Sequence, residues 1–305
     1  MNEYDAIVVG GNGAVGTLLC TLLSRGGRSV MSVDTRPFGT AVGTPALPAG
    51  EVDREIGDIV EPGARLTNLL RGAGTVVLAV PESVALNISL TLFTETALVV
   101  ETLSVKSAFA AKIAREGVAG PVLGINPMFA PSLGMEGRPV AAVTHSPGAA
   151  AEEFLGRIRG WGGRVVEVDS DTHDRLAAAT QALTHAAVLA FGSALTRLHV
   201  DPGLVEAVAP PPARTALALL ARIAAGEPEV YWDVQAGNPH AAAARSALAD
   251  AVRDMDAAVD TVSEGRFGEY VRAAGAAVPD IDAYGDLCAR LFGIVRGSAR
   301  EGDQP

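Results

Sequence analysis

The chain has 305 residues, of which 49% are hydrophobic and 19% charged, with a formal net charge of −11 at pH 7. That length is enough for two domains that each bury a core. The negative charge argues against a nucleic-acid partner, which needs a basic patch. It does not exclude an anionic small substrate, because a few convergent arginines can outweigh the global charge locally.

Two cysteines, Cys20 and Cys288, lie far apart in the sequence. Their separation matches no metal or redox motif, so we expect no metal site and a reducing compartment. The N-terminus has no basic region followed by an apolar stretch, so we expect no signal peptide and a cytoplasmic location.

The first half of the chain alternates β-branched runs with helical patterns, which is typical of a parallel sheet covered on both faces. Strands are predicted at residues 6–9, 29–33, 75–80, 97–100, 122–124, 140–143 and 165–168. Helices are predicted between them, for example at 14–25, 106–116 and 149–160. We therefore expect a doubly wound, mainly parallel α/β domain of the Rossmann class over residues 1–170.

After about Ser170 the pattern changes, because Ala- and Leu-rich segments follow the helical period and no convincing strand is found. The three prolines at 210–212 separate two helices, since proline cannot continue one. The most membrane-like stretch, 176–195, contains polar side chains that would be costly in lipid, so we predict a buried core helix and no membrane partner. An all-α domain is therefore expected over residues 171–305.

A glycine motif of the form G-x-G-x-x-G stands directly after the first predicted strand and opens a helix. Its first glycine makes a tight turn, its second lets a pyrophosphate approach, and its third lets the helix pack on the strand. The phosphate then sits on the free N–H groups of the helix N-terminus. A glycine-rich turn without a ligand is the alternative. The predicted cofactor-binding residues here are Gly11, Asn12, Gly13, Ala14, Val15 and Gly16.

The second predicted strand leads into Asp34. An acid at this place accepts hydrogen bonds from the adenosine ribose and repels a 2′-phosphate, so it favours NAD as the cofactor. Arg36 is close enough to hold a 2′-phosphate, although a solvated loop arginine is the simpler interpretation. Val80 and Pro81 form a corner that is expected to flank the cofactor from the other side, or to be only a turn.

Further segments follow in a fixed order: T-L-S-V-K at 102–106, G-I-N-P-M-F-A-P at 124–131 and Q-A-L-T-H at 181–185, then A-R-I at 221–223 and P-E-V-Y-W-D at 228–233. The series resembles prephenate dehydrogenases over roughly residues 10–272. The resemblance implies a Rossmann domain followed by an all-α dimerisation domain, a homodimer, and an active site in the cleft between the domains. It also implies a dehydrogenase alone, without a mutase or regulatory region.

The resemblance assigns Ser104 a place beside the nicotinamide and the reacting carbon, His185 a contact with the acidic side chain of the substrate, and Arg222 the ring carboxylate. Each has a plainer alternative: a helix cap for Ser104, a core residue for His185, and a snorkelling surface arginine for Arg222. A bidentate carboxylate contact would explain why Arg222 interrupts an apolar segment. Arg214 is a weaker candidate of the same kind.

The other histidines receive no catalytic role from the sequence. We predict that His173, with Asp174, marks a helix start and an interdomain feature. No role is assigned to His145, His199 or His240.

Asn126 is the departure from the family pattern, which has a histidine there to assist deprotonation of the ring hydroxyl. An amide cannot take a proton near neutral pH, so the enzyme is impaired, has another base, or uses a substrate that needs none. Hydride loss from a carbon that bears a neutral amine gives an iminium, which can drive decarboxylation without a base. The Asn126 carbonyl could orient such an amine, while another group or water accepts its ammonium proton beforehand.

We therefore predict NAD-dependent oxidative decarboxylation of 4-amino-4-deoxyprephenate to 4-aminophenylpyruvate, on the route to para-aminophenylalanine. One alternative is the oxidation of prephenate to 4-hydroxyphenylpyruvate. Another is a non-catalytic NAD-binding regulator, although a regulator has no evident need for Ser104, His185 and Arg222 together.

Overall fold

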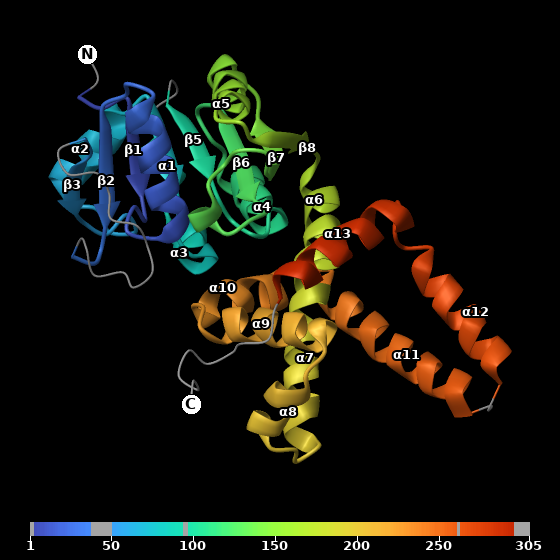
Figure 1. Cartoon of the computed structure of the whole chain (residues 1–305). Helices are drawn as coiled ribbons and strands as arrows, with labels where there is room; N and C mark the ends of the chain where they lie inside the picture. The colour runs from blue at the N-terminus through green and yellow to red at the C-terminus, as the bar shows by residue number, and fades with distance from the viewer. Residues whose placement is uncertain (1–2, 38–50, 94–96, 261–262, 296–305) are drawn as a thin grey trace, which may run out of the picture. The chain divides into compact units, whose positions relative to one another are not determined.

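The computed structural model describes residues 3–37, 51–93, 97–260 and 263–295 (Figure 1). The chain divides into two compact units. Unit 1 comprises Met1–Ala177 and a returning segment, Trp232–Pro239, and unit 2 comprises Ala178–Tyr231 and His240–Pro305. The division falls later than the predicted 170/171, because the helix that starts at Ser170 contributes buried side chains to unit 1.

Unit 1 is built on an eight-stranded sheet with the order β3-β2-β1-β4-β5-β6-β7-β8. Every pairing is parallel except that of β6 with β7. The prediction of a doubly wound, mainly parallel Rossmann sheet is confirmed. The strands are β1 (Ala6–Val9), β2 (Val30–Asp34), β3 (Asp53–Ile56), β4 (Thr75–Leu78), β5 (Leu98–Glu101), β6 (Val122–Pro127), β7 (Pro139–Ser146) and β8 (Arg164–Glu167).

One strand, β3, was not predicted. It has the sequence Asp-Arg-Glu-Ile, lies at the sheet edge beside β2, and exposes most of its side chains. An edge strand of this kind carries neither the apolar run nor the alternation that marks buried strands. Only the pairing with β2 makes it a strand.

Helices cover both faces of the sheet, and consecutive strand residues point into different cores. On one face Val8 packs in a cluster with Leu19 of α1 and Phe154 of α5, whereas on the other face Ile7 packs with Leu70 and Phe109. The helical segments of this unit are α1 (Ala14–Arg25), α2 (Ala64–Gly72), α3 (Glu82–Asn87), η1 (Leu90–Leu92), α4 (Ser107–Glu116), η2 (Pro131–Leu133), α5 (Ala149–Gly160), α6 (Ser170–Ala177) and η4 (Asp233–Gly237).

The described part of unit 2 consists of helices and contains no strand. The prolines at 210–212 separate two of them, as predicted, and the second begins at Pro211. The helical segments are η3 (Ala178–Ala182), α7 (Leu183–Arg197), α8 (Pro202–Val208), α9 (Pro211–Ala224), α10 (Pro228–Trp232), α11 (Ala241–Asp260), α12 (Glu264–Gly275) and α13 (Ile281–Ile294). The last residue of α10 already belongs to unit 1.

One helical stretch among the described residues, Ser170–Arg197, is long and apolar enough to cross a membrane by length and composition. Only 17% of its most apolar window is buried, and α7 contains no buried residue. The prediction of a buried core helix is therefore wrong for the single chain, because the described residues leave most of this apolar stretch uncovered.

Candidate functional site

The turn after β1 and the first turn of α1 require glycine at three positions, Gly10, Gly11 and Gly16. A Cβ on Gly11 would lie 1.8 Å from the Ser32 hydroxyl oxygen, and a Cβ on Gly16 would lie 2.2 Å from the Gly10 carbonyl oxygen. Gly10 itself has a φ of +81°, in the left-handed region that glycine tolerates. These contacts explain why the first and third glycines of the motif cannot carry a side chain: Gly11 packs against β2, and Gly16 packs against the Gly10 backbone.

Helix α1 begins at Ala14, and its N-cap, Gly13, supplies no side chain to the first turn. A Cβ on Gly13 would lie 3.2 Å from the Gly10 carbonyl oxygen and 4.0 Å from the Ala79 carbonyl oxygen. The helix N-terminus therefore keeps its backbone N–H groups for an anion. Asn12, Ala14 and Val15 lie in the same loop and first turn, where the sequence placed the pyrophosphate site.

Asp34, at the end of β2, is held by the glycine loop. One carboxylate oxygen accepts the Asn12 backbone N–H at 3.0 Å, and the other accepts the Arg36 backbone N–H at 3.0 Å. The Asn12 side chain in turn donates to the Arg36 carbonyl at 3.0 Å. The guanidinium of Arg36 is 62% exposed and lies 3.6 Å from the same carboxylate. The arrangement fixes a carboxylate beside the loop, where a ribose would lie.

Three further predicted site residues, Val80, Pro81 and Ser104, follow the carboxyl ends of β4 and β5. Val80 and Pro81 follow β4, and Pro81 is the N-cap of α3. Ser104 is half-buried in the turn between β5 and α4. The helix-cap alternative for Ser104 is wrong, because α4 begins at Ser107 with Lys106 as its N-cap residue.

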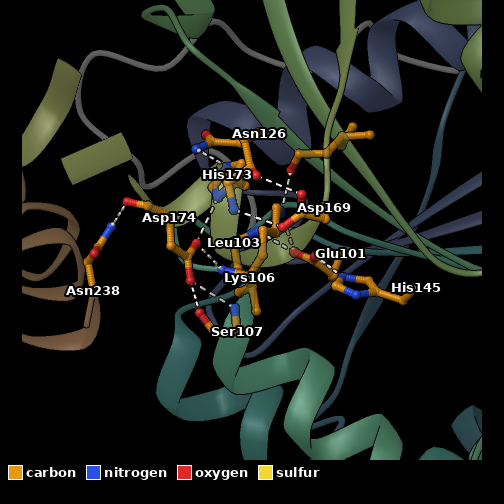
Figure 2. Close-up of polar contacts among 12 residues, drawn as sticks. Glu101, Leu103, Lys106, Ser107, Asn126, His145, Asp169, His173, Asp174 and Asn238 are labelled. Carbon is orange, nitrogen blue, oxygen red and sulfur yellow. Dashed lines mark hydrogen bonds and ion pairs between the residues drawn. The ribbon is translucent and has the colours of Figure 1, made fainter. Parts of the chain in front are cut away.

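Asn126, near the end of β6, is only 4% exposed and contacts a histidine from α6 (Figure 2). Its amide nitrogen lies 3.2 Å from Nε2 of His173, and Nδ1 of the same ring lies 2.8 Å from Oδ1 of Asp174. A carboxylate only accepts, so Nδ1 carries the proton of a neutral ring, and Nε2 of that ring accepts the hydrogen bond from Asn126. His173 is thus more than the helix-start feature expected from the sequence.

Asp174 also caps α4 from a different helix. Its carboxylate accepts the backbone N–H of Lys106 at 2.8 Å and that of Ser107 at 2.9 Å, and it accepts the Ser107 hydroxyl. Burial alone would raise the pKa of Asp174, but the hydrogen bonds from His173, Ser107 and Lys106 outweigh burial and lower it. The group is therefore an ionised carboxylate with its orientation fixed.

A buried ion pair lies beside this chain of contacts. Nζ of Lys106 donates to Glu101 at 2.7 Å and to the Ile125 carbonyl at 2.9 Å, while His145 lies 2.9 Å from the other Glu101 oxygen. Burial alone would raise the pKa of Glu101, but Lys106 and His145 lower it. Both members of the pair are fully buried. These contacts link β5, β6 and β7, and on β6 they involve Ile125, the residue before Asn126.

The returning segment of unit 1 adds an acidic pair. Asp233 accepts the backbone N–H of Glu82 at 3.4 Å, and Asn238 donates to the Asp174 carbonyl at 2.8 Å. Burial, and next the charge of Asp233, raise the pKa of Glu82 to about 7. Burial likewise raises the pKa of Asp233. This carboxyl pair therefore favours the protonated form more than exposed carboxyls do.

In unit 2, the charge of Arg222 acts on His185. Nδ1 of His185 is buried and has no hydrogen-bond partner in the described part of the chain, and its ring meets Tyr231 edge-on at 5.0 Å. Burial, and next the positive charge of Arg222, lower the pKa of His185. Arg222 is exposed. A neutral imidazole and a cation near each other suit an anionic ligand.

Arg214 has a structural role. Its guanidinium donates to the Ala209 carbonyl at 3.0 Å and to the Glu206 carbonyl at 3.1 Å, which caps the end of α8. These two hydrogen bonds account for Arg214 without a substrate. Arg214 therefore stays a weaker candidate for substrate binding than Arg222.

Sequence reasoning missed His173, Asp174, Lys106, Glu101 and His145 as a connected set. One signal was visible: Glu101 ends an otherwise apolar strand, and Lys106 follows five residues later. Buried charges are rare unless they are paired, so two of opposite sign five positions apart indicate a pair. The partners from α6 and β7 had no such signal.

Comparison with known proteins gives consistent matches. Residues 169–273 match the family described as "Prephenate dehydrogenase, dimerization domain". The 4-amino-4-deoxyprephenate dehydrogenase of Streptomyces pristinaespiralis is 43% identical over 291 residues, which cover 94% of this chain and 95% of that protein. The T-protein of Enterobacter agglomerans is 29% identical over 232 residues, or 75% of this chain and 55% of that protein.

A solved structure is also similar: prephenate dehydrogenase from Aquifex aeolicus in complex with hydroxyphenyl propionate and NAD+. The TM-score is 0.70 at 18% sequence identity, and the match covers 90% of this chain and 97% of that chain. At this level of identity the likeness shows a common fold.

Proposed function

Because the chain belongs to the prephenate dehydrogenase family, we propose that it catalyses the oxidative decarboxylation of 4-amino-4-deoxyprephenate to 4-aminophenylpyruvate. It is an NAD-dependent dehydrogenase. The observation that carries the choice of substrate is the 43% identity, along nearly the whole of both chains, to a 4-amino-4-deoxyprephenate dehydrogenase. The amide at position 126 supports the same choice.

The residues present fit NAD. The loop from Gly11 to Gly16 leaves no room for side chains at its first and third glycines, and the N-terminus of α1 is open to a pyrophosphate. The Asp34 carboxylate is fixed beside this loop, where it would accept hydrogen bonds from an adenosine ribose, and Val80 and Pro81 would flank the nicotinamide. When bound, NAD accepts the hydride of the ring carbon that carries the amine.

At the substrate, Asn126 would bind the amine through its carbonyl oxygen. As the hydride leaves, the neutral amine becomes an iminium, the bond to the ring carboxylate breaks, and its electron pair restores the aromatic ring as carbon dioxide departs. The product nitrogen ends as a neutral aniline, so no residue has to remove a proton in this step. An amide that accepts an N–H is sufficient, whereas a hydroxyl substrate would need a base at the same place.

The remaining substrate contacts are proposed from the chemical groups that Arg222, His185 and Ser104 carry. Arg222 would bind the ring carboxylate as a bidentate cation, and neutral His185 would contact the side-chain carboxylate or its ketone. Ser104 would lie beside the reacting carbon. These roles stay proposals, as does any contribution of Arg214.

The test compares the two substrates side by side. Purified protein should reduce NAD with 4-amino-4-deoxyprephenate at a kcat/KM at least about a hundredfold above that with prephenate, the lower end of the usual contribution of a general base. A preference for prephenate would favour the alternative of a prephenate dehydrogenase. A lack of turnover with either substrate, with NAD still bound, would favour a regulator.

We also propose a cytoplasmic homodimer formed through unit 2. Large apolar side chains there are exposed in the single chain, for example Leu198 at 67%, Val259 at 55% and Leu291 at 46%. A second copy would cover such surface, and the matched family is described as a dimerization domain. Sedimentation of the purified protein tests the dimer, and cell fractionation tests the location. A monomer, or a membrane-bound pool, would contradict these proposals.

A further inference from the structure

We propose that Asp174 and His173 orient the side-chain amide of Asn126, so that its carbonyl oxygen, and not its amino group, is presented to the substrate amine. His173 and Asp174 are then positioning residues for the reaction. This inference rests on the proposed function, and it concerns the direction in which a single amide points.

The orientation follows from the order of donors and acceptors. Asp174 is already fixed by two backbone N–H groups and the Ser107 hydroxyl, so its Oδ1 accepts the Nδ1 proton of His173 at 2.8 Å. In the neutral ring, Nε2 of His173 is then the unprotonated nitrogen. Such a nitrogen can only accept, and the atom of Asn126 that can donate to it is Nδ2, at 3.2 Å.

A flipped amide would place two acceptors against each other in a buried site. Asn126 is 4% exposed and His173 is 1% exposed, so water cannot relieve that contact at low cost. The flip is therefore disfavoured, and Oδ1 of Asn126 is left pointing away from His173. Oδ1 accepts no hydrogen bond from the described residues, so it is available to a ligand.

The direction matters for the chemistry of an amine. The nitrogen lone pair must enter the ring system as hydride leaves, and its N–H groups become more positive. A carbonyl that accepts one of these N–H groups stabilises the developing charge, whereas an amide N–H aimed at the nitrogen would bind the lone pair and oppose the reaction. The contact strengthens toward the transition state, so its loss should lower kcat more than it raises KM.

Two variants of His173 separate the two contacts of the ring. Glutamine can place an acceptor near the Nε2 position, facing Asn126, whereas asparagine can place a donor near the Nδ1 position, facing Asp174. His173→Asn should therefore lower kcat for 4-amino-4-deoxyprephenate by roughly tenfold or more, with a small change in KM, since tenfold corresponds to the loss of about one hydrogen bond. His173→Gln should stay within a few-fold of wild type.

The affinity for NAD, and unfolding by urea, serve as controls for damage to the fold. Equal losses in both variants would mean a structural role alone, and an unchanged kcat in His173→Asn would mean that Asn126 is oriented without His173. Either result overturns the inference.

A spectroscopic measurement keeps this inference separate from the choice of substrate. Nitrogen-15 NMR of labelled histidine in the wild-type dehydrogenase should assign His173 a protonated Nδ1 and a pyridine-type Nε2, with no substrate present. A protonated Nε2 would overturn the inference even if the amine substrate is oxidised. If the expected tautomer is found but wild type turns over only prephenate, then the proposed substrate is wrong and the orientation of Asn126 still stands.

Discussion

The Asp174 carboxylate on α6 accepts the backbone N–H of Ser107, the first residue of α4, at 2.9 Å. One acidic side chain thus caps a helix that is distant in sequence and fixes the histidine beside Asn126. The stability of the fold and the proposed orientation of Asn126 therefore both depend on the Asp174 carboxylate. Asp171, an exposed acid on the same helix, pairs with Arg175 of that helix.

Replacement of Asp174 should be costly to the fold. Asp174→Ala removes the cap of α4 and leaves buried N–H donors without an acceptor, so we expect a loss of about 2 to 4 kcal/mol in the free energy of unfolding. Urea unfolding measures it. The matched control is Asp171→Ala, an exposed acid on α6 that pairs with Arg175, which should cost less than about 1 kcal/mol. Equal effects of the two variants would contradict the capping role.

A comparison of NAD with NADP tests the predicted role of Asp34 in cofactor selection. A 2′-phosphate would meet this fixed carboxylate, so kcat/KM should be at least about tenfold higher with NAD than with NADP, or roughly 1.4 kcal/mol. Asp34→Ala should narrow the difference, with Arg36 then free to contact the phosphate. Comparable values for the two cofactors in wild type would show that Asp34 does not discriminate.

Arg222 tests the proposed carboxylate contact. Arg222→Ala should leave NAD affinity unchanged and lower kcat/KM by at least about a hundredfold, because a carboxylate loses a charged bidentate partner. Arg222→Lys should restore only part of the loss, since lysine lacks the planar fork. Arg197→Ala, an exposed arginine at the end of α7, is the control for a simple loss of charge. Wild-type behaviour of Arg222→Ala would refute the assignment.

Glu82 should make stability depend on pH. Its pKa is raised from 4.5 to about 7, so its contribution to stability is complete below pH 4.5 and is lost as the pH rises through 7. Glu82→Gln carries no charge, and it should therefore exceed wild type by about 1 to 3 kcal/mol at pH 8 but not at pH 4.5. Urea unfolding at the two pH values measures this. Glu61→Gln, at an exposed position, is the matched control for the substitution itself. An equal gain at both pH values for Glu82→Gln would rule out the titration.

Asn126→His should change the substrate. The unprotonated Nε2 of His173 would accept the N–H of the new imidazole, which leaves the other nitrogen of that imidazole as a base. We expect kcat/KM for prephenate to rise by about a hundredfold to ten-thousandfold, the usual range for general-base assistance. Turnover of the amine substrate should not improve. The measurement is kcat/KM for both substrates across a pH range, and no gain with prephenate would mean that Asn126 does not determine selectivity.

The sequence by itself determined the framework of the cofactor site and the alternation of strands and helices. The bounds predicted for β1, α1 and α5 match the structure, because each depends on local signals: an apolar run, a glycine motif or a helical period. The separation of α8 from α9 at the prolines has the same local cause. The replacement at Asn126 was likewise visible without a structure.

Only the tertiary structure decided which polar groups meet. Nothing local to His173 indicates Asn126, which lies 47 positions earlier, and nothing local to Arg214 indicates that it caps α8. The edge strand β3 exists because β2 offers it a partner. Periodicity reports which face of one element is buried, but a buried hydrogen bond between elements depends on how they pack, and that information is distributed over the whole chain.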